Sequence, residues 1–199
     1  DFLLHKFTSR YDLVIGNPPF NKLGSNHKSL AIYKKQSYNT DTTNTFSFFL
    51  EKALQISDYV SLIVPKFLLN TPEFRKTREL LEHKRIDSII DFGEKGFKGV
   101  LVETICISVN TVEQPSCTLV RSITENKLLI QKQKYICDGA FPYWIIYRDE
   151  FFDSICKRLS FGAFTVFRDR QITNKMLSAN GDIRVIKSRN INDSGTELI

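Results

Sequence analysis

The residues best suited to chemistry are Asn17, Pro18, Pro19 and Phe20, which directly follow a short apolar run, Tyr11 to Gly16. Consecutive prolines donate no backbone hydrogen bond and hold φ at about −65°, so the Asn17 side-chain oxygen and the Pro18 carbonyl can act as rigid acceptors. Two fixed acceptors would hold both hydrogens of an exocyclic amine, and Phe20 offers a face on which a planar base can stack. The tetrapeptide therefore predicts chemistry at a planar amine.

The element before the tetrapeptide predicts where it lies. An apolar run that ends at Gly16 is typical of a buried strand. Chemistry in open α/β sheets takes place at the carboxyl ends of strands. Asn-Pro-Pro can also be no more than a turn that ends a strand, but a six-residue run with Asp12 at its second position favours the catalytic interpretation.

Downstream, strand and helix patterns alternate, which predicts an α/β fold. Apolar residues at helical spacing follow a cap at Asn44 or Thr45, and Thr71-Pro72 opens a second helix. This second helix is expected to point three basic side chains outward: Arg75, Lys76 and Arg78. Strands are expected over residues 59–65, 86–92 and 100–109. The last two are joined by a loop too short for a crossover helix, so they must be antiparallel.

A polar stretch between Asn21 and Asn44 is too long for a plain connector and predicts a functional or mobile loop. No acidic residue lies between Asp12 and Asp41, whereas four lysines do: Lys22, Lys28, Lys34 and Lys35. The chain as a whole carries a net charge of +6, from 28 Lys and Arg against 22 Asp and Glu. These charges are compatible with a polyanionic partner, and a solvated surface loop is the alternative interpretation.

The cysteines and histidines do not indicate metal chemistry. The four cysteines are widely separated without a C-x-x-C spacing, and the three histidines stand alone: Cys106, Cys117, Cys137, Cys156, His5, His27 and His83. We expect no metal site and interpret the cysteines as small buried apolar side chains in a reducing compartment. No apolar run approaches the roughly 18 residues that would span a bilayer, so no membrane partner is expected.

The run YDLVIGNPPF resembles motif IV of the N6-adenine-specific DNA methyltransferases of restriction-modification systems, type II or IIG-like. The segments NTFSFFLEKAL, YVSLIVPKFLLN and DFGEKGFKGVLVETICISV resemble the same family in the same order. The resemblance implies that residues 1–140 are the C-terminal half of a Rossmann-like S-adenosylmethionine-dependent methyltransferase sheet with an antiparallel terminal hairpin. Residues 141–199, with FRDRQITNKM and GDIRVIKSRNI, more weakly resemble a linker helix and the beginning of a target-recognition domain.

Carried over by position, the resemblance implies a role for each residue of the tetrapeptide. Asn17 and Pro18 would accept the hydrogens of the target N6 amine and form one wall of the S-adenosylmethionine site, with Pro19 in the same catalytic motif. Phe20 would stack on the flipped base, and Phe97 lies where the family places a second aromatic against it. The four lysines of the loop would face the backbone of double-stranded DNA at the rim of the site.

The family's main cofactor motifs, a Gly-rich turn and an acidic residue, would lie upstream of residue 1. The only candidate within the chain is Asp91 to Gly96, but the residues after it alternate like a strand, so we interpret it as a hairpin loop. We therefore expect a cytoplasmic fragment of a longer enzyme that, alone, is inactive and does not bind S-adenosylmethionine.

Two alternatives to this function stay open. An Asn-Pro-Pro-aromatic motif serves any planar sp² amine, so the substrate could be an RNA base or a protein glutamine. The chain could also be a non-catalytic DNA-binding fragment. The sequence leaves open whether a restriction endonuclease domain or subunit accompanies it.

Overall fold

The computed structural model describes residues 1–93, 102–160, 163, 176–178, 180, 182 and 186, and the backbone of 191–192 and 195–196. The chain divides into two compact units, residues 1–153 and 154–199, and each is described by itself. In the second unit, strands β7 (Ile191–Asn192) and β8 (Gly195–Thr196) pair antiparallel.

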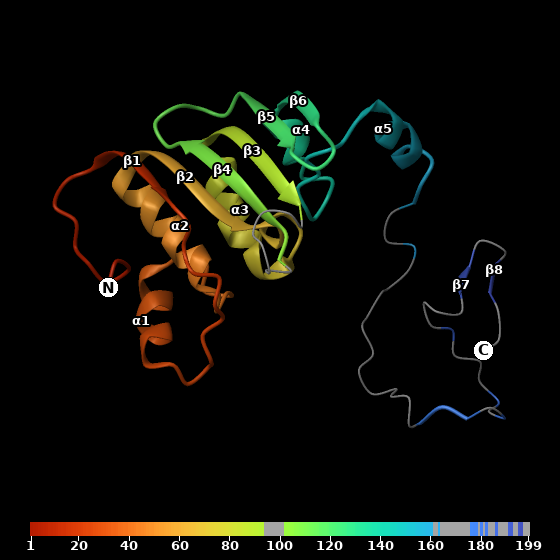
Figure 1. Cartoon of the computed structure of the whole chain (residues 1–199), viewed down its shortest axis with the longest axis horizontal. Helices are drawn as coiled ribbons and strands as arrows, with labels where there is room; N and C mark the ends of the chain where they lie inside the picture. The colour runs from red at the N-terminus through yellow and green to blue at the C-terminus, as the bar shows by residue number, and fades with distance from the viewer. Residues whose placement is uncertain are drawn as a thin grey trace. The chain divides into compact units, whose positions relative to one another are not determined.

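The first unit contains a mixed six-stranded sheet with the order β1-β2-β4-β3-β5-β6 (Figure 1). Strand β4 lies between β2 and β3 and is antiparallel to both, which confirms the predicted hairpin. β1 is parallel to β2, and β3 is parallel to β5, so the carboxyl ends of these four strands share one edge of the sheet. The strand bounds are Tyr11–Gly16, Ser57–Pro65, Arg85–Gly93, Thr104–Asn110, Cys117–Ser122 and Lys127–Lys132.

Helices α2 (Thr45–Ile56) and α3 (Arg75–Glu82) cover one face of this sheet (Figure 1). Alternate strand residues and the apolar stripe of α2 form the core beneath them, including Phe46, Leu50, Val60, Leu62, Val64, Ile89, Ile105 and Ile107. Asn44 caps α2 as predicted, although its side chain makes no capping hydrogen bond. Before α3, short 3-10 turns η1 (Lys66–Leu69) and η2 (Pro72–Phe74) carry the chain from β2, and η2 starts after Thr71 with Pro72 in its first turn, as the sequence predicts.

Three expectations from the sequence are wrong. β1 is not a buried strand, since it pairs only with β2 in the described part of the chain and Ile15 is 75% exposed. The polar stretch after Asn21 is not one long loop, because it contains helix α1 (Lys28–Gln36). Leu30 anchors this helix in a small second cluster with Leu3 and Phe48.

The third wrong expectation concerns Arg78, which is buried rather than solvent-facing. Its guanidinium donates to the carbonyl oxygens of Leu68 at 2.8 Å, Thr71 at 2.9 Å and Pro142 at 3.2 Å. Residues 68–71 and Pro142 thus both present carbonyl oxygens to Arg78 on α3. Burial of the guanidinium removes it from water, which disfavours its charged form and lowers the pKa of Arg78.

Beyond β6 the chain forms two short helices, α4 (Gln133–Ile136) and α5 (Glu150–Cys156). Asp149 caps α5, because its Oδ1 accepts from the Phe152 N–H at 2.8 Å. Strand β6 ends at Lys132, directly before α4. Among the described residues, no helix has the length and apolar character needed to cross a bilayer.

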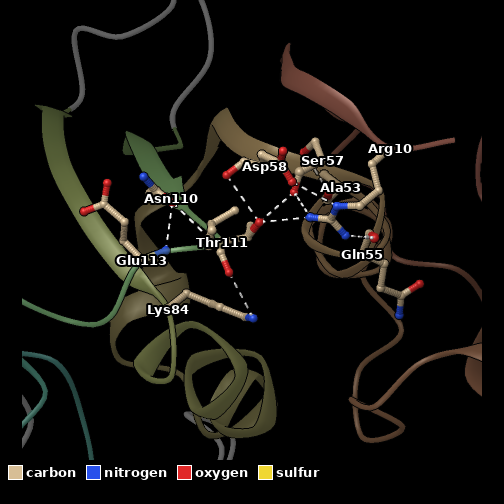
Figure 2. A network of polar contacts seen from close by, with 10 residues as sticks. Arg10, Ala53, Gln55, Ser57, Asp58, Lys84, Asn110, Thr111 and Glu113 are labelled. Carbon is tan, nitrogen blue, oxygen red and sulfur yellow. Dashed lines mark hydrogen bonds and ion pairs between the residues drawn. The ribbon is translucent and has the colours of Figure 1, made fainter.

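Arg10 directly precedes β1 and joins three elements, as Figure 2 shows. The Asn17–Phe20 loop lies at the other end of β1. The Arg10 guanidinium contacts Asp58 Oδ1 at 2.9 Å and donates to the backbone oxygens of Gln55 and Ser57 at 2.8 and 2.7 Å. It also donates to Thr111 Oγ1 at 3.1 Å, which itself donates to the Ser57 carbonyl at 2.7 Å. A single side chain thereby holds together the start of β1, the α2–β2 junction and the end of β4.

Candidate functional site

The Asn17–Phe20 loop lies at the carboxyl end of β1, as the sequence predicts. Asn17 and Pro19 are exposed, Pro18 is buried and Phe20 is half-buried. The Phe20 ring meets Phe46 of α2 edge to face, with 6.4 Å between the ring centroids and an angle of 85° between the planes. Phe20 is therefore anchored on the core while part of its surface reaches solvent.

The first residues of α2 hold the second half of this loop. The Thr45 hydroxyl donates to the carbonyl oxygens of Pro19 at 2.6 Å and Asn21 at 3.1 Å, and the Thr45 N–H donates to Asn21 O at 2.9 Å. By contrast, neither the Asn17 side chain nor the Pro18 carbonyl has a hydrogen-bond partner among the residues that the structure describes. The loop thus offers two unpaired acceptors on a backbone fixed from one side.

The four lysines do not form one patch on a single element. Lys22 follows the loop and pairs with Glu73 Oε2 at 2.9 Å. The others belong to α1, where Lys28 begins the helix and Lys34 and Lys35 lie in its last turn. Lys28 and Lys35 are exposed and Lys34 is half-buried.

A second polar cluster at the same edge of the sheet was not found from the sequence. Asp91, at the end of β3, is 2% exposed and pairs with Lys66 Nζ at 2.9 Å. Its carboxylate also accepts from the Tyr147 hydroxyl at 2.6 Å and the Gly93 N–H at 2.9 Å. Burial alone would raise the pKa of Asp91, but the hydrogen bonds from Tyr147, Lys66 and Gly93 outweigh it and lower that pKa.

Lys66 also pairs with Glu103 at 2.9 Å and lines a hollow of about 270 Å³ together with Phe67, Asn70, Val102 and Glu103. Phe67 packs against Phe46 at 5.9 Å between centroids, and Phe46 in turn contacts Phe20. Aromatic rings therefore connect the hollow to the Asn17–Phe20 loop. The sequence did contain one indication of the Lys66–Asp91 cluster, because both residues lie at the carboxyl ends of predicted strands.

Phe97, expected as the second stacking aromatic, lies outside the described residues, as does the second half of the Asp91–Gly96 segment. The strands on either side of that segment are antiparallel neighbours, so the connection is a hairpin, as predicted, rather than a cofactor turn that opens a helix. Gly93 adopts φ 58° at the end of β3, and a Cβ there would approach Thr124 Cγ2 to 2.9 Å. Glycine is needed at this position for both reasons.

The described residues fit only one side of a cofactor site. Asn17 and Pro18 present acceptors at the carboxyl end of β1, where small molecules bind in open α/β sheets. No Gly-rich turn between a strand and a helix accompanies them in the described ranges. Among the residues that the structure describes, no three His, Cys, Asp or Glu side chains gather in an arrangement that would hold a metal ion. Cys117 is exposed, so the expectation that the cysteines are buried is wrong for this residue.

Residues 2–97 match the Eco57I restriction-modification methylase family. The matched segment of this methylase family runs from the N-terminal residues through β1, the Asn17–Phe20 loop, α2, β2, α3 and β3. No curated protein is significantly similar to the chain in sequence.

The sheet has the fold of S-adenosylmethionine-dependent methyltransferases. A Listeria monocytogenes protein described as a class I enzyme of this kind superposes with a TM-score of 0.50 at 19% identity, over 61% of this chain and 39% of that one. The modification subunit assigned to a type I restriction enzyme of Vibrio vulnificus YJ016 gives a TM-score of 0.50 at 17% identity, over 61% and 27% of the two chains. The chain therefore spans well under half the length of these structural relatives.

Proposed function

We propose that the protein transfers a methyl group from S-adenosylmethionine to N6 of adenine in double-stranded DNA, as the modification part of a restriction-modification system. The observation that carries the proposal is the pair of unpaired acceptors, the Asn17 side chain and the Pro18 carbonyl, on the loop that ends β1. The family match over residues 2–97 supports the same chemistry.

In this proposal the loop orients the nucleophile. Asn17 Oδ1 and Pro18 O accept the two hydrogens of the exocyclic amine and draw them out of the plane of the ring, which localises the nitrogen lone pair. Phe20 stacks on the base after it leaves the duplex, with its own position fixed by Phe46. S-adenosylmethionine supplies an electrophilic methyl group when bound. The N–C bond would form as the bond between the methyl group and sulfur breaks, with S-adenosylhomocysteine as the leaving group and the amine proton passing to water, so no covalent enzyme intermediate is needed.

DNA is the proposed polyanionic partner. Three lysines of α1, Lys28, Lys34 and Lys35, supply positive charge near the loop in sequence, and Lys22 adds a fourth. The proposal also includes a target-recognition domain that begins within residues 141–199. It further includes a restriction endonuclease domain or subunit as partner and a cytoplasmic location.

The test compares Asn17→Ala with Asn26→Ala in the full-length protein. Asn26 is exposed and lies beyond the loop in the sequence, so its loss should leave turnover unchanged. Asn17→Ala should abolish transfer of labelled methyl groups to duplex DNA and leave DNA binding largely intact, because the side chain orients the amine rather than docking the duplex. Digestion of the product to nucleosides should yield 6-methyladenosine in its deoxy form.

Near-normal turnover in Asn17→Ala would contradict the assignment. Labelling of RNA or of a protein glutamine in place of DNA would move the substrate to those alternatives. DNA binding by a full-length protein that contains the cofactor but transfers no methyl group would indicate a non-catalytic binding module.

A further inference from the structure

We infer that Glu73 is a positioning residue for the Asn17–Phe20 loop. This inference rests on the proposed function and adds a residue that acts on the acceptors from outside the loop. Glu73 lies in the short η2 turn before α3, far from the loop in sequence but next to it in the fold. Its carboxylate contacts Lys22, just beyond the loop, and also Thr42 and Thr43, which precede the residue that supports the loop, Thr45.

The two carboxylate oxygens of Glu73 bind different partners. Oε2 accepts from Lys22 Nζ at 2.9 Å, and Lys22 is two residues beyond Phe20. Oε1 accepts from the Thr42 hydroxyl at 2.8 Å and from the Thr43 N–H at 3.3 Å. The Glu73 side chain is 19% exposed, whereas that of Lys22 is 63% exposed. The carboxylate is thus the fixed member of the pair.

Residues 38–44, which we name the strap, connect this carboxylate to the loop. The Leu23 N–H donates to Thr43 O at 2.9 Å, and Lys22 and Asn44 form an isolated β-bridge. The strap leads directly into Thr45, whose hydroxyl and N–H hold the carbonyls of Pro19 and Asn21. Displacement of Thr42 and Thr43 would therefore shift the support beneath the loop.

The rest of the strap is held to α2 and α3 by contacts that do not involve the Glu73 carboxylate. Glu51 of α2 accepts from the Tyr38 and Asn39 N–H groups at 2.7 and 3.0 Å, and the Asn39 amide donates to Thr77 of α3 at 2.7 Å. Loss of Glu73 should consequently release only the end of the strap nearest the loop. This local effect separates a positioning role from general destabilisation.

The charge of Glu73 is stable at neutral pH. Burial alone would raise the pKa of this carboxyl, but its contacts with Lys22, Thr42 and Thr43 outweigh the burial and lower that pKa. Removing the carboxylate also frees the ammonium of Lys22, which then stands unpaired beside the proposed DNA surface. Affinity for DNA should therefore not fall when Glu73 is removed.

The experiment uses the full-length protein with Glu73→Ala, Glu73→Gln and the control Glu79→Ala. Glu79 is a half-buried carboxylate of α3 that pairs with Arg75, and its one contact with the strap in the described part of the chain is a long hydrogen bond from the Tyr38 hydroxyl, 3.5 Å, at the end of the strap far from the loop. Glu73→Ala should lower the single-turnover methylation rate about tenfold or more with an unchanged or lower KM for DNA, because misplacement of about 1 Å can cost up to roughly 100-fold in rate. Glu73→Gln keeps an acceptor for the strap and should recover most of the rate.

Hydrogen–deuterium exchange provides a readout that does not depend on activity. In Glu73→Ala, peptides covering residues 21–23 and 42–45 should exchange at least about fivefold faster, with unchanged exchange at the Tyr38 and Asn39 amides. Glu79→Ala should leave both regions unchanged. If Asn17→Ala is inactive but Glu73→Ala matches the wild type in rate and exchange, the positioning inference is wrong and the proposed function stands. If the wild type methylates nothing, the exchange result still decides the inference.

Discussion

The Tyr147 hydroxyl donates a 2.6 Å hydrogen bond to the buried carboxylate of Asp91. This bond joins the chain beyond β6 and α4 to the carboxyl end of β3, at the edge of the sheet that carries the Asn17–Phe20 loop. Lys66 completes the arrangement from the end of β2. Three segments distant in sequence therefore meet on one carboxylate, and its ionisation should be visible in the stability of the protein.

Asp91 should make stability fall in acid. Its folded-state pKa lies below the ordinary value of 3.8, so its contribution is fully present above about pH 4 and is lost as the pH falls through the folded-state pKa. Urea unfolding of the wild type and Asp91→Asn between pH 7 and pH 2.5 should show a difference that is largest at neutral pH and shrinks below about pH 4. A difference that does not change with pH would contradict the assigned ionisation.

Replacement of Arg10 should destabilise the protein without touching the proposed site. Arg10→Ala removes the hydrogen bonds to Asp58, Gln55, Ser57 and Thr111, and we expect a loss of about 1–3 kcal/mol in the free energy of unfolding. Arg10→Lys should recover less than half of this loss, because an ammonium cannot reproduce the guanidinium fork. Thermal or urea unfolding measures both, with Lys6→Ala as a control for removal of a nearby exposed charge.

The lysines should contribute unequally to DNA binding. Neutralising Lys28, Lys34 or Lys35 to Gln should reduce the slope of log Kd against log salt by about one for each phosphate that the variant no longer neutralises. Lys22→Gln should change the slope less, because the Lys22 ammonium is already paired with Glu73. Fluorescence anisotropy across a salt series tests this order, and an unchanged slope in the Lys28/Lys34/Lys35 triple variant would assign α1 to the solvated surface.

Phe20 should tolerate tyrosine but not alanine. Phe20→Ala removes the proposed stacking surface, which should weaken binding of the flipped base by about 1–3 kcal/mol, and it also removes the edge-to-face packing on Phe46. Phe20→Tyr keeps both. Methylation kinetics together with thermal unfolding separate the two effects, and complete inactivation by tyrosine would indicate that Phe20 serves only the core.

Much of the fold was predictable because its strands are apolar and regularly spaced. Runs such as residues 59–65 and 86–92 are short and rich in β-branched residues, and the short connection after β3 required an antiparallel partner. The Asn17–Phe20 loop was predictable because chemistry gathers at strand ends. The composition of β1 is that of a buried strand, since Ile15 and its neighbours are apolar, and its exposure follows from its place at an edge of the described sheet.

Contacts between distant segments account for what the sequence did not show. Helix α1 is largely polar, and its anchor Leu30 becomes meaningful only when Leu3 and Phe48 are beside it. Arg78 resembles its exposed neighbours until the carbonyls of Leu68, Thr71 and Pro142 surround it. Glu73 is likewise an ordinary acidic residue near a helix start until the strap lies against it.

The place of β4 between β2 and β3 has a consequence for how the chain acquires its structure during synthesis. β2 and β3 share no backbone hydrogen bonds, so of the ladders that the structure describes among β1 to β4, only β1–β2 can form before residues 104–110 emerge, and isolated two-stranded pairs are marginally stable in water. β4 pairs with β2 and β3, which are both synthesised before it. Its pairing with β2 brings together residues as far apart in sequence as Tyr59 and Asn110. Such non-local pairing slows folding. A nascent chain that stalls before Thr104 would therefore expose the apolar strands β2 and β3 to chaperones and to other unfinished chains.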